Sequence, residues 1–94
     1  MNIVVKSSAN IKDVLGSHKL EIELQPQASL FELLAQLTRR FGSAFDRQIR
    51  DQLTGEIVPF LLLINGKTFR STVDLPTLLH DGDTVTIMLP FDGG

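Results

Sequence analysis

Cysteine is absent from this chain of 94 residues. Without thiols the chain can form no disulfide bond, no thiolate metal site and no iron–sulfur cluster, and it has no side-chain sulfur nucleophile. Any sulfur chemistry carried out by this protein must therefore use a group other than a cysteine side chain.

Long apolar runs and clusters of one charge are also missing. No stretch approaches the ~20 apolar residues of a membrane span, and residues 1–6 lack the basic and apolar regions of a signal peptide. We therefore expect a cytoplasmic protein with no membrane partner. Nine basic residues against eleven acidic ones give a formal charge of −2. Because basic and aromatic residues do not interleave, nucleic acid is not an expected partner either.

Motifs for catalysis, nucleotide binding and metal binding are lacking as well. His18 and His80 stand alone in the sequence, and neither belongs to a pattern that would place it beside an activated hydroxyl or a metal. Asp81-Gly82-Asp83 is too short for a calcium loop and is better explained as a tight turn. No phosphate-binding glycine motif occurs. We expect a carrier or a small non-catalytic subunit, with no metal and no bound cofactor.

The apolar residues that are present, 43% of the chain, suffice for one modest core. We expect a single domain over residues 1–94, ending in a flexible tail over about residues 90–94. Alternation of apolar and polar residues predicts strands. The predicted strands lie at 2–6, 19–25, 60–64, 67–70 and 84–89.

The clearest helix signal begins at Ser29, which with Glu32 forms a capping box. Leucines at helical spacing follow as far as Phe41, and Gly42 then supplies a stop signal. Residues 43–53 predict one or two short helical turns, and Leu75, Leu78 and Leu79 predict another. Asn65-Gly66 predicts a tight type I′ hairpin after an apolar run, which we expect to form a buried strand.

The resulting order is two strands, a helix and three strands. This order predicts an α+β domain with the β-grasp, or ubiquitin-like, fold: a mixed five-stranded sheet covered by one main helix, with the first and last strands parallel at its centre.

The end of the chain resembles the MoaD/ThiS family of ubiquitin-like sulfur carriers. The features that carry the resemblance are the D-G-D turn at 81–83, the alternating strand after it, Pro90, and the terminal Gly93-Gly94. Asn65-Gly66 is similar to the family's preceding hairpin. The segment from Phe41 to Gly55 looks more like the MoaD-type members, the small subunits of molybdopterin synthase.

This resemblance implies a role for the C-terminal carboxylate. A ubiquitin-activating-type enzyme would adenylate Gly94 with ATP, and sulfide or a persulfide would displace AMP to give a thiocarboxylate. The tail would then enter the large subunit of molybdopterin synthase, or an equivalent sulfur acceptor enzyme. Three other interpretations stay open. The chain could be a ubiquitin-like modifier joined through Gly94 to lysines, a sulfur carrier for thiamine or cysteine synthesis, or a plain β-grasp interaction domain.

The candidate site therefore lies at the end of the chain. Gly94 is the expected reacting group, because its carboxylate would be adenylated and thiocarboxylated. Gly93 and Asp92 would thread a narrow channel, for which glycine is suited because it lacks Cβ. Phe91, Pro90 and Met88 are expected to contact the partner. In an extended chain, residues 90–94 would reach about 15 Å beyond the last strand.

Overall fold

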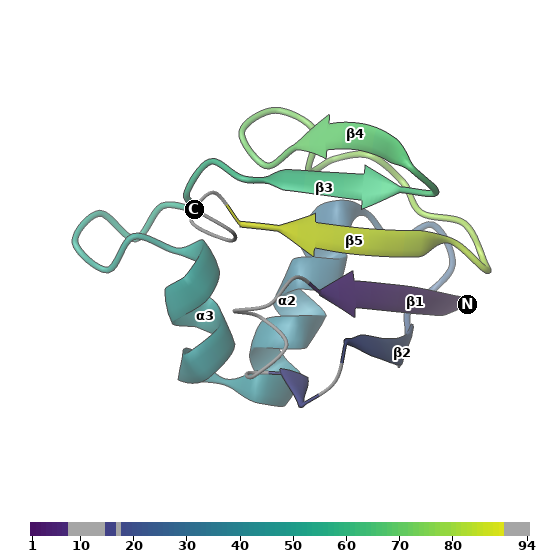
Figure 1. Ribbon diagram of the computed structural model, residues 1–94, viewed down its shortest axis with the longest axis horizontal. Helices are drawn as coiled ribbons and strands as arrows, with labels where there is room; N and C mark the ends of the chain where they lie inside the picture. The colour runs from purple at the N-terminus through teal and green to yellow at the C-terminus, as the bar shows by residue number, and fades with distance from the viewer. Residues whose placement is uncertain (8–14, 17, 90–94) are drawn as a thin grey trace.

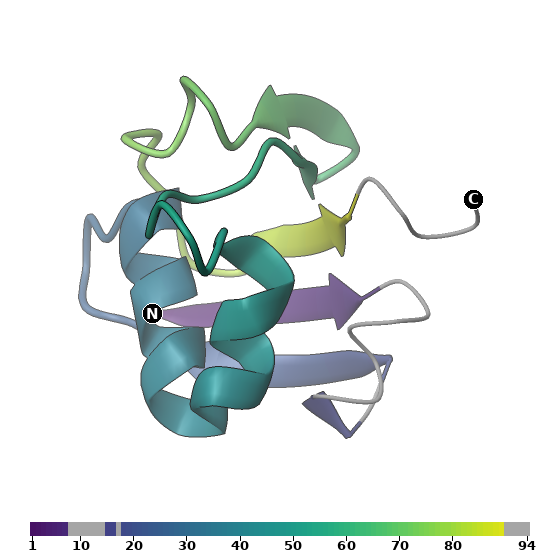
Figure 2. The same cartoon turned by 90° about the vertical axis from the view of Figure 1, so that its left-hand side faces the viewer.

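The computed structural model describes residues 1–7, 15, 16 and 18–89. Its elements are β1 (Asn2–Ser7), β2 (Lys19–Glu23), α2 (Leu30–Phe41), α3 (Ser43–Ile49), β3 (Leu61–Ile64), β4 (Lys67–Arg70) and β5 (Thr84–Met88). α2 and α3 lie on one face of a single sheet, and neither of these helices covers the other face, which we call the open face (Figures 1 and 2).

The five strands are arranged in the order β2-β1-β5-β3-β4. β1 and β2 pair antiparallel, and β1 and β5 run parallel at the centre of the sheet, as predicted. β3 joins the other side of β5 in an antiparallel pair and turns back into β4. The predicted β-grasp topology is confirmed.

The helix predicted from the capping box is also confirmed. The Ser29 hydroxyl accepts a hydrogen bond from the backbone N–H of Glu32 at 3.2 Å. Gly42 ends α2 with φ 69° and ψ −150°, and its N–H bonds the carbonyl of Thr38. Ser29 thus satisfies an N–H that the first turn would leave without an acceptor.

The core lies between the sheet and the helices. It comprises the buried face of α2 (Leu30, Leu33, Leu34 and Leu37), Phe45 and Ile49 of α3, and alternate residues of the central strands. α3 is the short helix expected in residues 43–53, but it ends at Ile49. Leu53 therefore lies outside the helix and does not join Phe45 and Ile49 in the core. It is 97% exposed.

Two sequence predictions are wrong. Residues 75–79 form no helical turn, because their backbone bonds the start of α2 instead: Leu30 N–H donates to Thr77 and Phe31 N–H to Leu75. The run 60–64 is not buried throughout, since the helices cover only one face of the sheet. Leu61 is 42% exposed.

The hairpin at Asn65-Gly66 has the backbone that its sequence predicts. Asn65 has φ 51° and Gly66 φ 86°, and a type I′ turn requires positive φ at both central residues. Among the described residues no helix is long and apolar enough to cross a membrane.

Candidate functional site

The site begins with the two faces of β5. Val85 and Ile87 are fully buried toward the helices, Leu89 just after the strand is 4% exposed, and Met88 is 42% exposed. Because successive side chains of a strand point to opposite faces, Thr86 and Met88 lie on the open face. On the neighbouring strand β1, Lys6 pairs with Thr86.

Met88 extends an apolar surface that β3 also builds. In the register of the two strands, Leu61 lies opposite Met88 and Leu63 lies opposite Thr86. We call Leu61, Leu63 and Met88 the β3–β5 patch. It lies on the open face, at the end of the sheet where β5 finishes.

A hollow of about 320 Å³ adjoins this patch. Pro59, Leu61, Met88 and Leu89 line it, and Arg70 is its charged lining residue. A contiguous exposed apolar patch with a polar rim is a feature of protein-interaction sites, where arginine is enriched. Leu89, which lines the hollow, directly precedes residue 90 in the sequence, where the predicted tail begins.

Ser71 fixes the segment that leads into β3. Its hydroxyl donates to the carbonyl of Val58 at 2.8 Å and accepts from the N–H of Phe60 at 2.8 Å. Both bonds hold the chain just before Leu61, so the patch is built on a fixed backbone rather than on a loose loop.

At the opposite end of β5, the D-G-D segment forms the predicted turn. Asp83 accepts from the N–H of His80 and from the side-chain amide of Asn65, both at 2.8 Å. Asp81 accepts from the N–H of Asn2 at 2.7 Å. The two carboxylates therefore bind backbone and amide donors, which agrees with a structural turn.

Of the predicted site residues, the structure places Met88. Pro90, Phe91, Asp92, Gly93 and Gly94 lie outside the described residues. The expected roles of this tail in threading and in partner contact stay predictions.

The contribution of β3 was missed by sequence reasoning. Leu61, Leu63 and Arg70 join Met88 because of strand pairing between segments distant in the sequence. A signal did exist: a continuous apolar run in a sheet covered on one side must expose every second residue. The mistaken assumption was that both faces of this strand would be covered.

No metal-binding group of three or more histidine, aspartate or glutamate residues occurs within residues 1–7, 15–16 and 18–89. His18 and His80 are both exposed, as expected for histidines outside a site. What this end of the sheet can offer a partner is an apolar docking surface.

Fold and site together define a ubiquitin-like protein with an exposed apolar patch at the end of its last strand. The sequence model of the ThiS family matches residues 5–94. The chain therefore belongs to the ThiS family, whose members are small ubiquitin-like carrier proteins.

Individual relatives agree with this assignment. The chain is 26% identical to small archaeal modifier protein 3 of Haloferax volcanii over 95 residues, with all of both chains covered. Its fold matches SAMP1 of Haloferax volcanii with a TM-score of 0.81 at 21% identity, covering 100% of both chains. A putative molybdopterin converting factor subunit 1 from Pyrococcus furiosus matches with a TM-score of 0.74 at 22% identity, covering 96% of this chain and 98% of the other.

Proposed function

We propose that this protein is a sulfur carrier that works through the carboxylate of Gly94. The observation that carries the proposal is the β3–β5 patch, an exposed apolar surface at the end of β5, the strand that precedes the terminal Gly93-Gly94 in the sequence. Membership of the ThiS family supports the same conclusion.

The chemistry takes place in two steps on a partner enzyme. A carboxylate is a poor acyl electrophile, so Gly94 first attacks the α-phosphate of ATP and pyrophosphate leaves. Hydrosulfide then adds to the acyl carbon of the adenylate. The bond from that carbon to the phosphate oxygen breaks, AMP leaves with the electron pair, and loss of a proton gives the thiocarboxylate.

The protein contributes docking and reach rather than catalytic groups. The β3–β5 patch and the hollow beside it would bind the ubiquitin-activating-type enzyme, with Phe91 and Pro90 extending the contact. Gly93 and Asp92 would lie in the channel that leads to the nucleotide. Glycine suits that channel because no side chain obstructs it.

The sulfur acceptor that we propose is the large subunit of molybdopterin synthase. The resemblance to MoaD-type members and the similar fold of the putative molybdopterin converting factor subunit support this choice. The large subunit would supply the acid–base groups, and this chain would be its small, non-catalytic partner.

A second candidate function is protein modification through an isopeptide bond from Gly94 to target lysines. The relative named as a small archaeal modifier protein favours it. Both functions begin with the same adenylate and differ in the nucleophile that attacks it.

Intact-mass spectrometry separates the two functions. The purified chain is incubated with ATP, sulfide and a candidate activating enzyme. A carrier gains the mass difference of one oxygen replaced by sulfur, and a synthase large subunit with its pterin substrate then reverses this change. Lysine adducts in cell extract without free thiocarboxylate would instead establish the modifier. A chain that keeps its original mass with every activating enzyme would contradict both functions.

A further inference from the structure

Leu53 is the most exposed large apolar residue among those described, at 97%. It lies in the segment between α3 and β3, which we call the Leu53 loop (residues 50–57). Isolated exposed leucines are common on protein surfaces. What distinguishes this one is the number of bonds that hold its loop.

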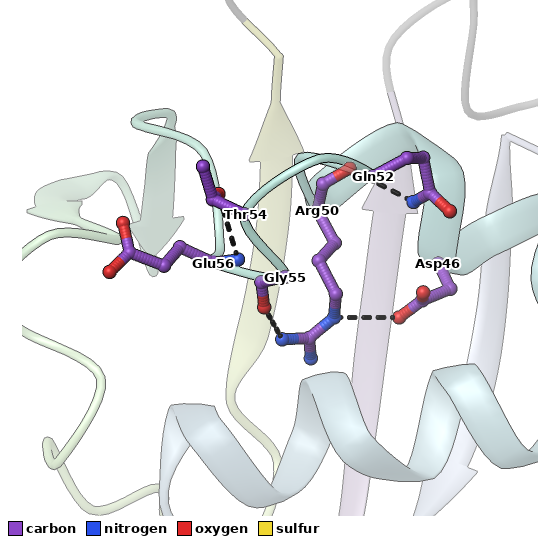
Figure 3. A network of polar contacts seen from close by, with 6 residues as sticks. All are labelled: Asp46, Arg50, Gln52, Thr54, Gly55 and Glu56. Atoms are coloured by element: carbon purple, nitrogen blue, oxygen red, sulfur yellow. Dashed lines mark hydrogen bonds and ion pairs between the residues drawn. The ribbon is translucent and has the colours of Figure 1, made fainter.

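The Leu53 loop is closed and braced by polar contacts (Figure 3). Arg50 and Ile57 form a β-bridge at its base. The Arg50 guanidinium bonds Asp46 at 3.1 Å and the carbonyl of Gly55 at 2.6 Å. Asp51 accepts from the N–H of Leu53 at 2.8 Å and of Thr54 at 3.2 Å. A residue on such a loop loses little conformational freedom when it binds.

Next to the base of this loop lies a hollow of about 260 Å³. Phe31, Leu34 and Ala35 of α2 line it together with Ile49 and Ile57. Phe31 is 54% exposed there. Since a cavity of about 150 Å³ accepts benzene, this hollow is large enough for a leucine side chain. Figure 2 shows the helices and the Leu53 loop on the side toward the viewer.

The same surface carries opposite charges. Arg39 lines the hollow together with Arg50, and Arg39 is exposed. Glu56 is exposed on the loop, and Figure 3 shows its carboxylate pointing away from the contacts that brace the loop. A surface with a projecting apolar residue, a hollow to receive it and both signs of charge can be complementary to itself.

We propose that two copies of this chain associate through this surface as a symmetric dimer. Leu53 of each copy fills the hollow of the other, and Glu56 of each copy lies against Arg39 of the other. Because a two-fold axis relates the two copies, each of these contacts occurs twice in the dimer. The helices and the Leu53 loop lie across the sheet from the β3–β5 patch, so the dimer leaves the docking surface free. This inference goes beyond the proposed function and does not depend on it.

Sedimentation velocity on the full chain, from micromolar to millimolar concentration, tests the dimer. We expect concentration-dependent dimerisation in the wild type and at least about a tenfold weaker association in Leu53→Asp, as for a central contact residue. Val73→Asp is the matched control, because Val73 is also exposed, at 60%, but lies between β4 and β5. It should dimerise like the wild type, and amide NMR spectra establish that both variants are folded.

Charge reversal tests the arrangement independently of Leu53. Arg39→Glu and Glu56→Arg should each weaken dimerisation, and the double variant should recover it. Failure of the double variant to recover would overturn this arrangement. A wild type that is monomeric at every concentration would overturn the dimer, and so would association that Leu53→Asp leaves unchanged. A monomer that binds a different protein through Leu53 would equally count against self-association.

Discussion

Asp83 shows how one residue can fix the start of the strand that leads to the tail. Its side chain is 12% exposed, and it accepts hydrogen bonds from His80 and from Asn65. Asn65 in turn accepts from the N–H of Thr84 at 2.9 Å. The two tight turns at this end of the sheet are thereby joined through side chains.

We predict that Asp83→Ala lowers the free energy of unfolding by about 1–3 kcal/mol, because it leaves partly buried donors without an acceptor. Urea denaturation measures the change. His80→Ala is the control, since the histidine side chain is 84% exposed and its backbone N–H, rather than its ring, makes the 2.8 Å bond. Equal stability of both variants would contradict the role given to Asp83.

Local signals of this kind could be predicted from the sequence. The D-G-D turn and the Asn65-Gly66 turn depend on residues adjacent in the chain, and both occur where the sequence predicts them. The hydrogen bond between the Asn65 and Asp83 side chains could not be predicted, because it requires the pairing of β3 with β5.

At the scale of elements, Gly42 forms the junction between α2 and α3. Its φ of 69° and ψ of −150° place it in a region that is essentially restricted to glycine. A Cβ added there would meet no atom within 4 Å. The requirement for glycine is therefore one of backbone conformation and not of space.

Gly42→Ala should lower the free energy of unfolding by about 1–3 kcal/mol through backbone strain. Ser43→Ala, at the next position, should change it by less than about 0.5 kcal/mol, since exposed positions away from special contacts tolerate substitution. Thermal and urea unfolding of both variants provide the comparison. A Gly42→Ala variant as stable as the wild type would mean that the α2–α3 junction can adopt another conformation.

Elements were predictable where one pattern dominated the local sequence. Ser29, the leucine stripe and Gly42 predict a helix that the structure places at Leu30–Phe41. The leucines at 75–79 have helical spacing too, but their backbone groups bond α2, and that competition is decided by tertiary contacts. The burial of β3 was overestimated for a similar reason, since only the assembled fold shows which face is covered.

At the scale of the molecule, two exposed apolar surfaces lie on opposite sides of the sheet. The β3–β5 patch lies on the open face of the sheet, and the hollow beside the Leu53 loop lies on the helical side. The sequence identified the strand that ends at the first surface and the terminal glycines. It could not reveal the second surface, which combines α2 with a loop beyond α3.

Leu61→Asp should reduce adenylation of Gly94 at least about tenfold in kcat/KM, because a charge would disrupt the apolar contact with the activating enzyme. Stability should change little, since Leu61 is already 42% exposed. ATP–pyrophosphate exchange measures the effect, and Val73→Asp again serves as the control. Phe91→Ala should act in the same direction. Exchange at the wild-type rate in Leu61→Asp would exclude the patch from docking.

Deletion of Gly94 should abolish adenylation without unfolding the protein. Gly94 comes after the last strand in the sequence, so we expect the free energy of unfolding to stay at the wild-type value. The new terminal carboxylate would end about 3.5 Å short of the α-phosphate, and a misplacement of that size prevents reaction.

Gly93→Val should prevent adenylation for a different reason, because a β-branched side chain stiffens the tail and obstructs a channel suited to glycine. Pyrophosphate exchange measures adenylation of both variants, and intact-mass analysis measures thiocarboxylate formation. His18→Ala is the control and should remain active. Wild-type exchange and sulfur transfer in the Gly94 deletion would show that the carboxylate of Gly94 is not the reacting group.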